Sequence, residues 1–148
     1  RAGRSATQPI GRCSMKQLVL AAAFIVGASA TSATALPPLS QQDAINEGLL
    51  AVGIADEIRK KCDAIAPRMI RALTFMNSLE NKAKAMGYSE AEIKAYVTNK
   101  AEKAKMRAKG EAYLSKAGVM KDNPLSYCTV GRDEVARGSL IGSFLRVR

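Results

Sequence analysis

Helical periodicity is the sequence feature that most constrains the fold of this chain. From residue 40 onward, apolar residues recur at three- and four-residue steps, and no segment of useful length alternates between apolar and polar residues as a half-buried β-strand does. Capping residues, glycines and prolines divide this region into segments of helical length. The pattern predicts an all-α fold, a small bundle of four to five helices.

Two long helices are predicted first. One covers about residues 41–62, and Ser40 and Asp43 at its start have capping-box spacing. The other begins at Pro67, a residue suited to the first position of a helix, and ends at Gly87, which predicts a left-handed C-cap. Its apolar face, predicted to lie in the core, consists of Met69, Ala72, Leu73, Met76, Leu79, Ala83 and Met86. As an alternative, the methionines of this face would form an adaptable binding groove.

A dense start signal predicts the next helix. Ser89 and Glu92 have the spacing of a capping box, and Tyr88 and Ile93 have the spacing of the hydrophobic staple around it. Because these residues satisfy the first free N–H groups of a helix, we expect helix from about residue 90.

Later signals define the last helices. After a break, helix is expected over residues 100–116, with Gly118 as its stop. Asn123 as N-cap and Pro124 at the first position start a final helix, predicted over residues 125–145. Three glycines inside it either weaken it or let neighbouring backbones approach closely: Gly131, Gly138 and Gly142.

The first 35 residues have the layout of a secretory signal peptide. Met15 opens a short basic segment, residues 18–28 form an apolar run, and a small-residue segment ends in an A-x-A motif at Ala35. The run is shorter than the roughly 20 apolar residues that span a bilayer. We therefore predict a signal peptide over residues 15–35, with cleavage after Ala35 and export to the periplasm. An uncleaved membrane anchor and a mitochondrial presequence are the alternatives.

Both the first 35 residues and the region after them carry a net positive charge. Lys and Arg total 23 and Asp and Glu total 13 among 148 residues, a formal net charge of +10. Four of the bases and none of the acids precede residue 36, so residues 36–148 keep 19 bases and 13 acids, a net charge of +6. Residues 36–148 are interpreted as a single helical domain with no integral membrane segment, and residues 1–14 as upstream sequence outside the product.

Basic residues cluster between Lys94 and Lys109, where Glu102 is the one acid. On a helix they form an electropositive face suited to an acidic protein or an anionic membrane surface. The alternative is a solvated face whose alanines pack inward, namely Ala101, Ala104, Ala108 and Ala112. Nucleic acid is not an expected partner, because few aromatic residues accompany the bases. The candidate partner-binding residues are Lys100, Lys103, Lys105, Arg107 and Lys109, together with a polar cluster of Arg132, Asp133 and Glu134.

Two of the three cysteines, Cys62 and Cys128, lie in the predicted domain, and Cys13 precedes it. In an oxidising compartment the default state of two such thiols is a disulfide. The chain-entropy model gives closure of the intervening loop a stabilisation of roughly 4 kcal/mol. Two buried free thiols, or a redox-active Cys62 activated by its three basic neighbours, are the alternatives.

The composition excludes several kinds of site. The chain has no His, which rules out Ser-His-Asp and Cys-His nucleophile pairs and His-ligated metal or haem. Three cysteines are too few for a four-thiolate metal site. We therefore predict no catalytic, cofactor-binding or metal-binding residues, and expect a non-enzymatic interaction protein. A module that binds a small apolar ligand is the alternative.

Three short segments carry a resemblance to a known family. They are Ile-Arg-Lys-Lys-Cys at residues 58–62, Gly-Tyr-Ser with Glu-Ile at residues 87–93, and Tyr-Cys leading into Gly-Arg-Asp-Glu at residues 127–134. Together they resemble an uncharacterised family of small exported alphaproteobacterial proteins, a domain of unknown function, over nearly all of residues 15–148. The resemblance implies a periplasmic helical domain and supplies no activity, cofactor or catalytic residue. Because such proteins are often encoded among genes for the respiratory NADH–quinone oxidoreductase, it also implies an accessory role at that membrane complex.

Overall fold

The structure, a computed structural model, describes residues 36–148. The predicted signal peptide, its cleavage after Ala35 and the upstream segment 1–14 lie outside the described residues. The described part is mostly helical, which confirms the predicted all-α class. It contains six α-helices and a small two-stranded sheet, where the sequence pattern predicted four or five helices and no strand.

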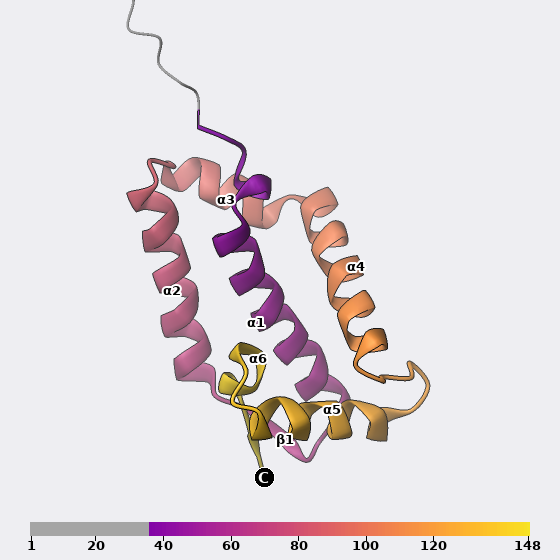
Figure 1. Ribbon diagram of the computed structural model, residues 1–148. Coiled ribbons are helices and arrows are strands. Elements are labelled where there is room, and N and C mark those ends of the chain that lie inside the picture. Colours follow the sequence, from indigo (N-terminus) through magenta and orange to yellow (C-terminus); the bar gives the residue numbers. More distant parts are fainter. Residues whose placement is uncertain (1–35) are drawn as a thin grey trace, which may run out of the picture. The chain divides into compact units, whose positions relative to one another are not determined.

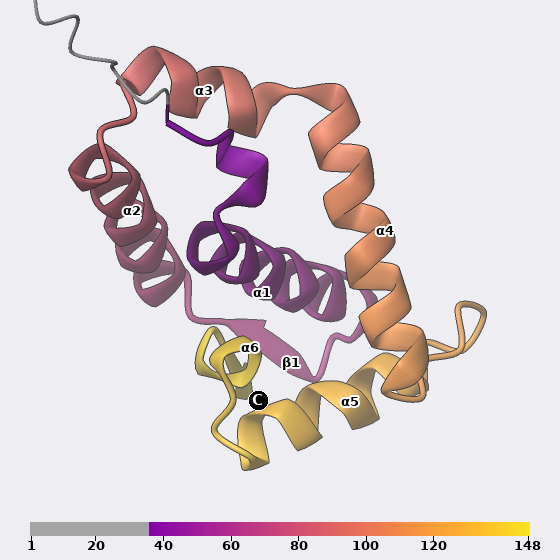
Figure 2. The same cartoon turned by 45° about the horizontal axis from the view of Figure 1, so that its top comes forward.

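A central helix, α1 (Asp43–Lys61), organises the domain. On opposite sides of it lie α2 (Met69–Ala85) and α4 (Lys100–Lys116), and α3 (Glu90–Thr98) joins these two across one end (Figure 1). At the other end of α1 lies α5 (Pro124–Ala136), so that Figure 2 shows a frame of helices around α1. The short elements are η1 (Leu39–Gln41), β1 (Ile65–Pro67), α6 (Leu140–Ser143) and β2 (Leu145–Val147).

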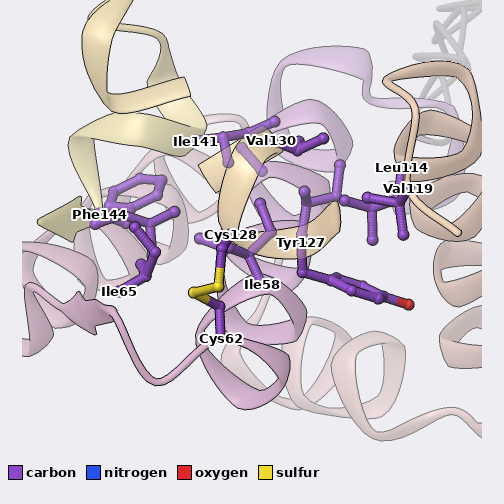
Figure 3. Packing of buried hydrophobic residues seen from close by; sticks show 14 residues of the cluster. Ile58, Cys62, Ile65, Leu114, Val119, Tyr127, Cys128, Val130, Ile141 and Phe144 are labelled. Carbon is purple, nitrogen blue, oxygen red and sulfur yellow. A yellow bond between two sulfur atoms is a disulfide. The ribbon is translucent and has the colours of Figure 1, made fainter. Parts of the chain in front are cut away.

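Two apolar clusters hold these elements together. The larger cluster lies where α1 meets α5, α6 and the sheet, and it includes the fully buried side chains of Ile58 and Ile65 (Figure 3). The smaller cluster joins η1 and the start of α1 to the end of α2 and includes Leu79 and Tyr88. Since short helices are marginal in water on their own, burial in these clusters supplies most of their stability.

Several predicted helix ends are confirmed. Ser89 and Glu92 form both bonds of the capping box: the Ser89 hydroxyl accepts from the Glu92 backbone N–H, and the Glu92 carboxylate accepts from the Ser89 N–H at 2.8 Å. The helix breaks at Asn99, whose side chain accepts from the first N–H groups of α4. Asn123 caps α5, as its Asn-Pro sequence predicts. Gly87 has the left-handed conformation expected of a C-cap, with φ 101°.

Two predicted helix starts are wrong. The capping box of Ser40 with Asp43 is not formed, because a 3-10 turn precedes α1 and Gln42 takes the N-cap position without a side-chain bond. Pro67 does not start α2 but ends β1, where it pairs with Leu145. A proline is compatible with this position because the strand is short and lies at an edge.

The predicted final helix over residues 125–145 is also wrong, since it is divided in the structure. It ends at Ala136, and Gly138 follows with a left-handed φ of 61°. Ser139 then caps the short helix α6 by accepting from the Gly142 N–H at 3.0 Å. The chain therefore turns back, and β2 can pair with β1.

The predicted core face of α2 is partly wrong. Leu79 and Ala83 are buried as expected, but Met69 and Leu73 are exposed. Ala72 packs against the larger cluster as predicted, and Phe75, which lies outside the predicted face, packs there as well, so the buried side of the first half of α2 is shifted toward Phe75. Relative to the predicted orientation, α2 is thus rotated about its own axis, and Met69 and Leu73 lie beside its contact with α1 and not within it.

Gly131 of α5 lies against α1 with no room for a side chain. A Cβ atom there would lie 2.7 Å from Ile58 Cγ2 and 3.2 Å from Ile65 Cγ1. We expect Gly131→Ala to lower the free energy of unfolding by about 1–3 kcal/mol, because overpacking must displace a buried side chain. In the control, Gly53→Ala in α1, the new methyl group meets nothing within 4 Å, and stability should rise by about 0.5–1 kcal/mol. Urea denaturation measures both, and effects of the same sign would contradict this packing.

Candidate functional site

A disulfide closes the domain at the end of α1. The Sγ atoms of Cys62 and Cys128 lie 2.00 Å apart and their Cα atoms 5.2 Å apart, which confirms the predicted pair. Cys62 is the C-cap residue of α1 and Cys128 lies within α5, with the apolar side chains of Ile58 and Tyr127 nearby (Figure 3). Because both sulfur atoms are bonded and both residues are buried, this pair provides a covalent link and no exposed nucleophile.

A fully buried carboxylate, that of Glu134, joins three helices. Its Oε1 atom accepts hydrogen bonds from the Tyr113 hydroxyl of α4 at 2.6 Å and from the Arg137 guanidinium at 2.5 Å. Its Oε2 atom accepts from the hydroxyl of Ser139, the N-cap residue of α6. Both oxygens are thus satisfied inside the protein, and the carboxylate links α4, α5 and α6.

The contacts of Glu134 constrain two further residues, Gly142 and Tyr113. A Cβ atom on Gly142 would lie 2.0 Å from the backbone oxygen of Glu134, so only glycine fits there. The hydrogen bond to Glu134 raises the pKa of Tyr113 above its usual value of 10.0, and burial acts in the same direction. Since folding favours the protonated phenol, the contribution of Tyr113 to stability is fully present below about pH 10 and is lost as the pH rises further.

The role of Glu134 differs from its predicted one. With no exposed surface it cannot touch a partner, whereas Arg132 and Asp133 beside it are exposed on α5. A sequence signal for burial exists: Tyr127, Val130 and Glu134 follow one another at helical spacing, so the glutamate occupies a core position of α5. No local sequence pattern indicates that Tyr113 and Ser139 form hydrogen bonds with Glu134.

The basic segment forms an exposed surface on α4. We call it the cationic face of α4, and it consists of Lys100, Lys103, Lys105, Arg107 and Lys109, all exposed. The expectation that alanines of this helix pack inward is wrong: Ala101, Ala104, Ala108 and Ala112 are exposed as well. Gly110 and Leu114 are buried instead, and a Cβ atom at Gly110 would lie in ordinary contact with α1, 3.5 Å from Ile54 Cγ1 and 3.7 Å from Leu50 Cδ1.

Several hollows mark the surface of the described residues. Two wider ones, of about 620 and 420 Å³, have charged residues in their walls, among them Arg137 in the first and Lys61 in the second. Two apolar crevices are smaller, about 200 Å³ beside Met106 and about 170 Å³ beside Met69. Ligand pockets usually measure about 300–1,000 Å³, so the size of these crevices does not favour the alternative of a small apolar ligand.

Two further properties of the described residues concern membranes and metal ions. Within residues 36–148, no helix combines the length and apolar character needed to span a membrane. Nor do these residues bring together three or more side chains of the His, Cys, Asp or Glu types in a way that could hold a metal ion.

The fold and these features define the class: a small helical domain closed by one disulfide, with a buried carboxylate that ties three of its helices together. The chain belongs to the family described as "Family of unknown function (DUF5333)", which matches residues 37–146. The predicted membership in an uncharacterised family is thereby confirmed. No curated protein and no solved structure matches the chain.

Proposed function

We propose that this protein is a non-enzymatic accessory protein of the periplasm that binds an acidic protein partner through the cationic face of α4. One observation carries the proposal: all five basic side chains of this face are exposed, and among these five only Lys105 has an ion-pair partner within residues 36–148, Glu102 at 2.8 Å. Exposed charges of one sign repel one another in the free protein, and an acidic partner removes that repulsion.

The arrangement of α4 supports this use. Helical spacing places Lys100, Lys103 and Arg107 in one row along the helix, and Lys105 and Lys109 in a second row. The buried Gly110 and Leu114 fix the inward side of α4. Lys103 and Arg107 lie on this side and border hollows beside α1, whereas Lys105 and Lys109 lie on the opposite side, so the rigid helix presents exposed positive charge on two sides. A rigid row of charges loses little conformational freedom on binding and therefore favours association.

Other observations support the compartment and the kind of partner. Disulfides persist in oxidising compartments, so the bond between Cys62 and Cys128 favours export. The family resemblance indicates a respiratory membrane complex as the first partner to test.

Charge reversal on the cationic face tests the proposal. We expect Lys103→Glu with Arg107→Glu to lower the amount of partner recovered roughly tenfold, because attraction becomes repulsion at the interface. The measurement is affinity purification from detergent-solubilised membranes of the native host, quantified by mass spectrometry at low salt and at about 0.5 M salt, where screening is strong.

A matched variant controls for net charge. Lys82→Glu with Lys94→Glu reverses two exposed charges on α2 and α3 and should leave the recovered partner unchanged. If the α4 variant retains the partner as well as the wild-type protein does, or if recovery does not depend on salt, the cationic face of α4 is not the binding surface.

A further inference from the structure

The first turns of α2 expose large apolar side chains to solvent. Ile70 is 83% exposed, Leu73 is 59% exposed and Met69 is 52% exposed. They lie within five residues of one another, and together they form a continuous apolar ridge on the flank of the helix. Single exposed apolar residues are ordinary, whereas a group of three large ones indicates a surface that contacts something apolar.

Two arginines lie at the start of α2. Arg68 is its N-cap residue and Arg71 directly follows Ile70 in the first turn, and both are exposed. The backbone N–H of Arg68 also donates to the Phe144 oxygen at 2.7 Å, which fixes the start of α2 beside the end of the chain.

Acidic side chains are missing from these segments. Neither residues 64–79 nor residues 138–148 contain Asp or Glu. The acid of α1 that lies beside the ridge, Asp56, is already paired with Arg59 at 2.5 Å and with Lys60 at 2.5 Å. The positive charge of the arginines is therefore not balanced locally within these segments.

An apolar crevice of about 170 Å³ adjoins the ridge. Met69 and Leu73 form one wall of it, α1 contributes Val52 to the lining, and Phe144 and Leu145 line it as well. Its volume is too small for a helix of another protein, but it can accept an apolar chain end or side chain.

We propose that this surface, which we call the α2 surface (Arg68, Met69, Ile70, Arg71 and Leu73), docks on an anionic phospholipid membrane. The three apolar side chains enter the boundary between headgroups and acyl chains, and the arginines bind the lipid phosphates. Basic residues next to exposed apolar side chains are the combination that interfacial membrane binding requires.

A second copy of the chain fits this surface less well. Two copies that met through it would bring two sets of arginines together with no acid from residues 64–79 to separate them, and like charges opposed at an interface disfavour association. The proposal does not depend on the proposed function, because α2 and α4 lie on opposite sides of α1 (Figure 1). A protein bound to lipid through α2 would keep the cationic face of α4 free for a partner.

The chain contains no Trp, which permits a test on the whole protein with no background signal. Ile70→Trp places a single indole at the centre of the apolar ridge, and Ala108→Trp places one at an exposed position on α4. We expect phosphatidylglycerol vesicles to shift the emission of Ile70→Trp to shorter wavelength and to let brominated lipid quench it. The emission of Ala108→Trp should not change. Because the readout is local, insertion of any leader segment cannot imitate it.

The second part of the test measures how vesicle binding depends on an arginine of this surface. In the Ile70→Trp background, Arg71→Glu should lower the vesicle partition coefficient at least about fivefold, since each basic residue near an anionic surface contributes roughly that factor. Lys103→Glu changes net charge equally and should have a smaller effect. Phosphatidylcholine vesicles should give no shift.

Four outcomes would overturn the proposal. They are an unchanged Ile70→Trp spectrum with phosphatidylglycerol vesicles, an equal shift for Ala108→Trp, equal losses from Arg71→Glu and Lys103→Glu, and a concentration-dependent shift without lipid, which would indicate contact between copies. None of these measurements involves the protein partner of α4, so a failure here and a failure of the proposed function are distinguishable.

Discussion

Replacing Cys62 and Cys128 together by alanine is expected to lower the free energy of unfolding by about 4 kcal/mol. The bond joins residues 66 apart in sequence, so its loss gives the unfolded chain much more conformational freedom. Both residues are also buried, and removal of two sulfur atoms from the core adds a packing loss. Since domains of this size have a total stability of typically 5–15 kcal/mol, the loss is a large fraction of the whole.

Urea denaturation of the double variant, monitored by circular dichroism, measures this effect. Reduction of the wild-type protein should lower stability by a similar amount. Reductant added to the double variant is the control and should leave its stability unchanged, because no cysteine then remains in residues 36–148. Alkylation before reduction should modify neither Cys62 nor Cys128, and both should react after reduction. A wild-type protein whose stability is indifferent to reductant would show that this bond does not hold the domain together.

Replacing Glu134 by alanine is expected to lower the free energy of unfolding by about 2–4 kcal/mol. The variant leaves the hydroxyls of Tyr113 and Ser139 and the guanidinium of Arg137 without their acceptor, and it opens a cavity between α4, α5 and α6. We expect Glu134→Gln to lose less, about 1–3 kcal/mol, because its shape is kept and one oxygen can still accept the Tyr113 bond.

Glu111→Ala provides the matched control. Glu111 lies on α4 and, like Glu134, forms an ion pair, with Lys121 at 3.0 Å, but its side chain is 49% exposed. Exposed ion pairs contribute little, so this change should cost less than about 1 kcal/mol. Thermal and urea unfolding with the disulfide intact measure all three variants. If the Glu134 and Glu111 variants lost equal free energies of unfolding, the buried carboxylate would contribute no more to stability than an exposed ion pair does.

The sequence predicted the features that depend on a few neighbouring residues. The capping box at Ser89, the break at Asn99 and the Asn-Pro start of α5 were recognisable because each bond joins groups within about one helical turn. The disulfide pair was predictable for another reason, since residues 36–148 contain only two cysteines. The exposed basic residues of α4 were likewise visible as a cluster of charge.

The rest of the structure depends on distant segments. The sequence predicts a helix start at Pro67, but in the structure Pro67 pairs with Leu145. Periodicity places Glu134 on the inner side of α5, but it does not show that Tyr113 and Ser139 are the groups that bond to it. The rotation of α2 that exposes Met69 could not be read from periodicity, because periodicity shows that a helix has an apolar face but not how much of that face its neighbours cover.

The sequence by itself determined that this chain forms helices, where most of them begin and end, and which two sulfur atoms are bonded, because these follow from local hydrogen bonding and from composition. Only the tertiary structure decided which polar group is buried and which apolar groups are exposed, because burial is a property of the contacts between segments far apart in the chain. The buried Glu134 and the exposed ridge at Ile70 both arise at that level.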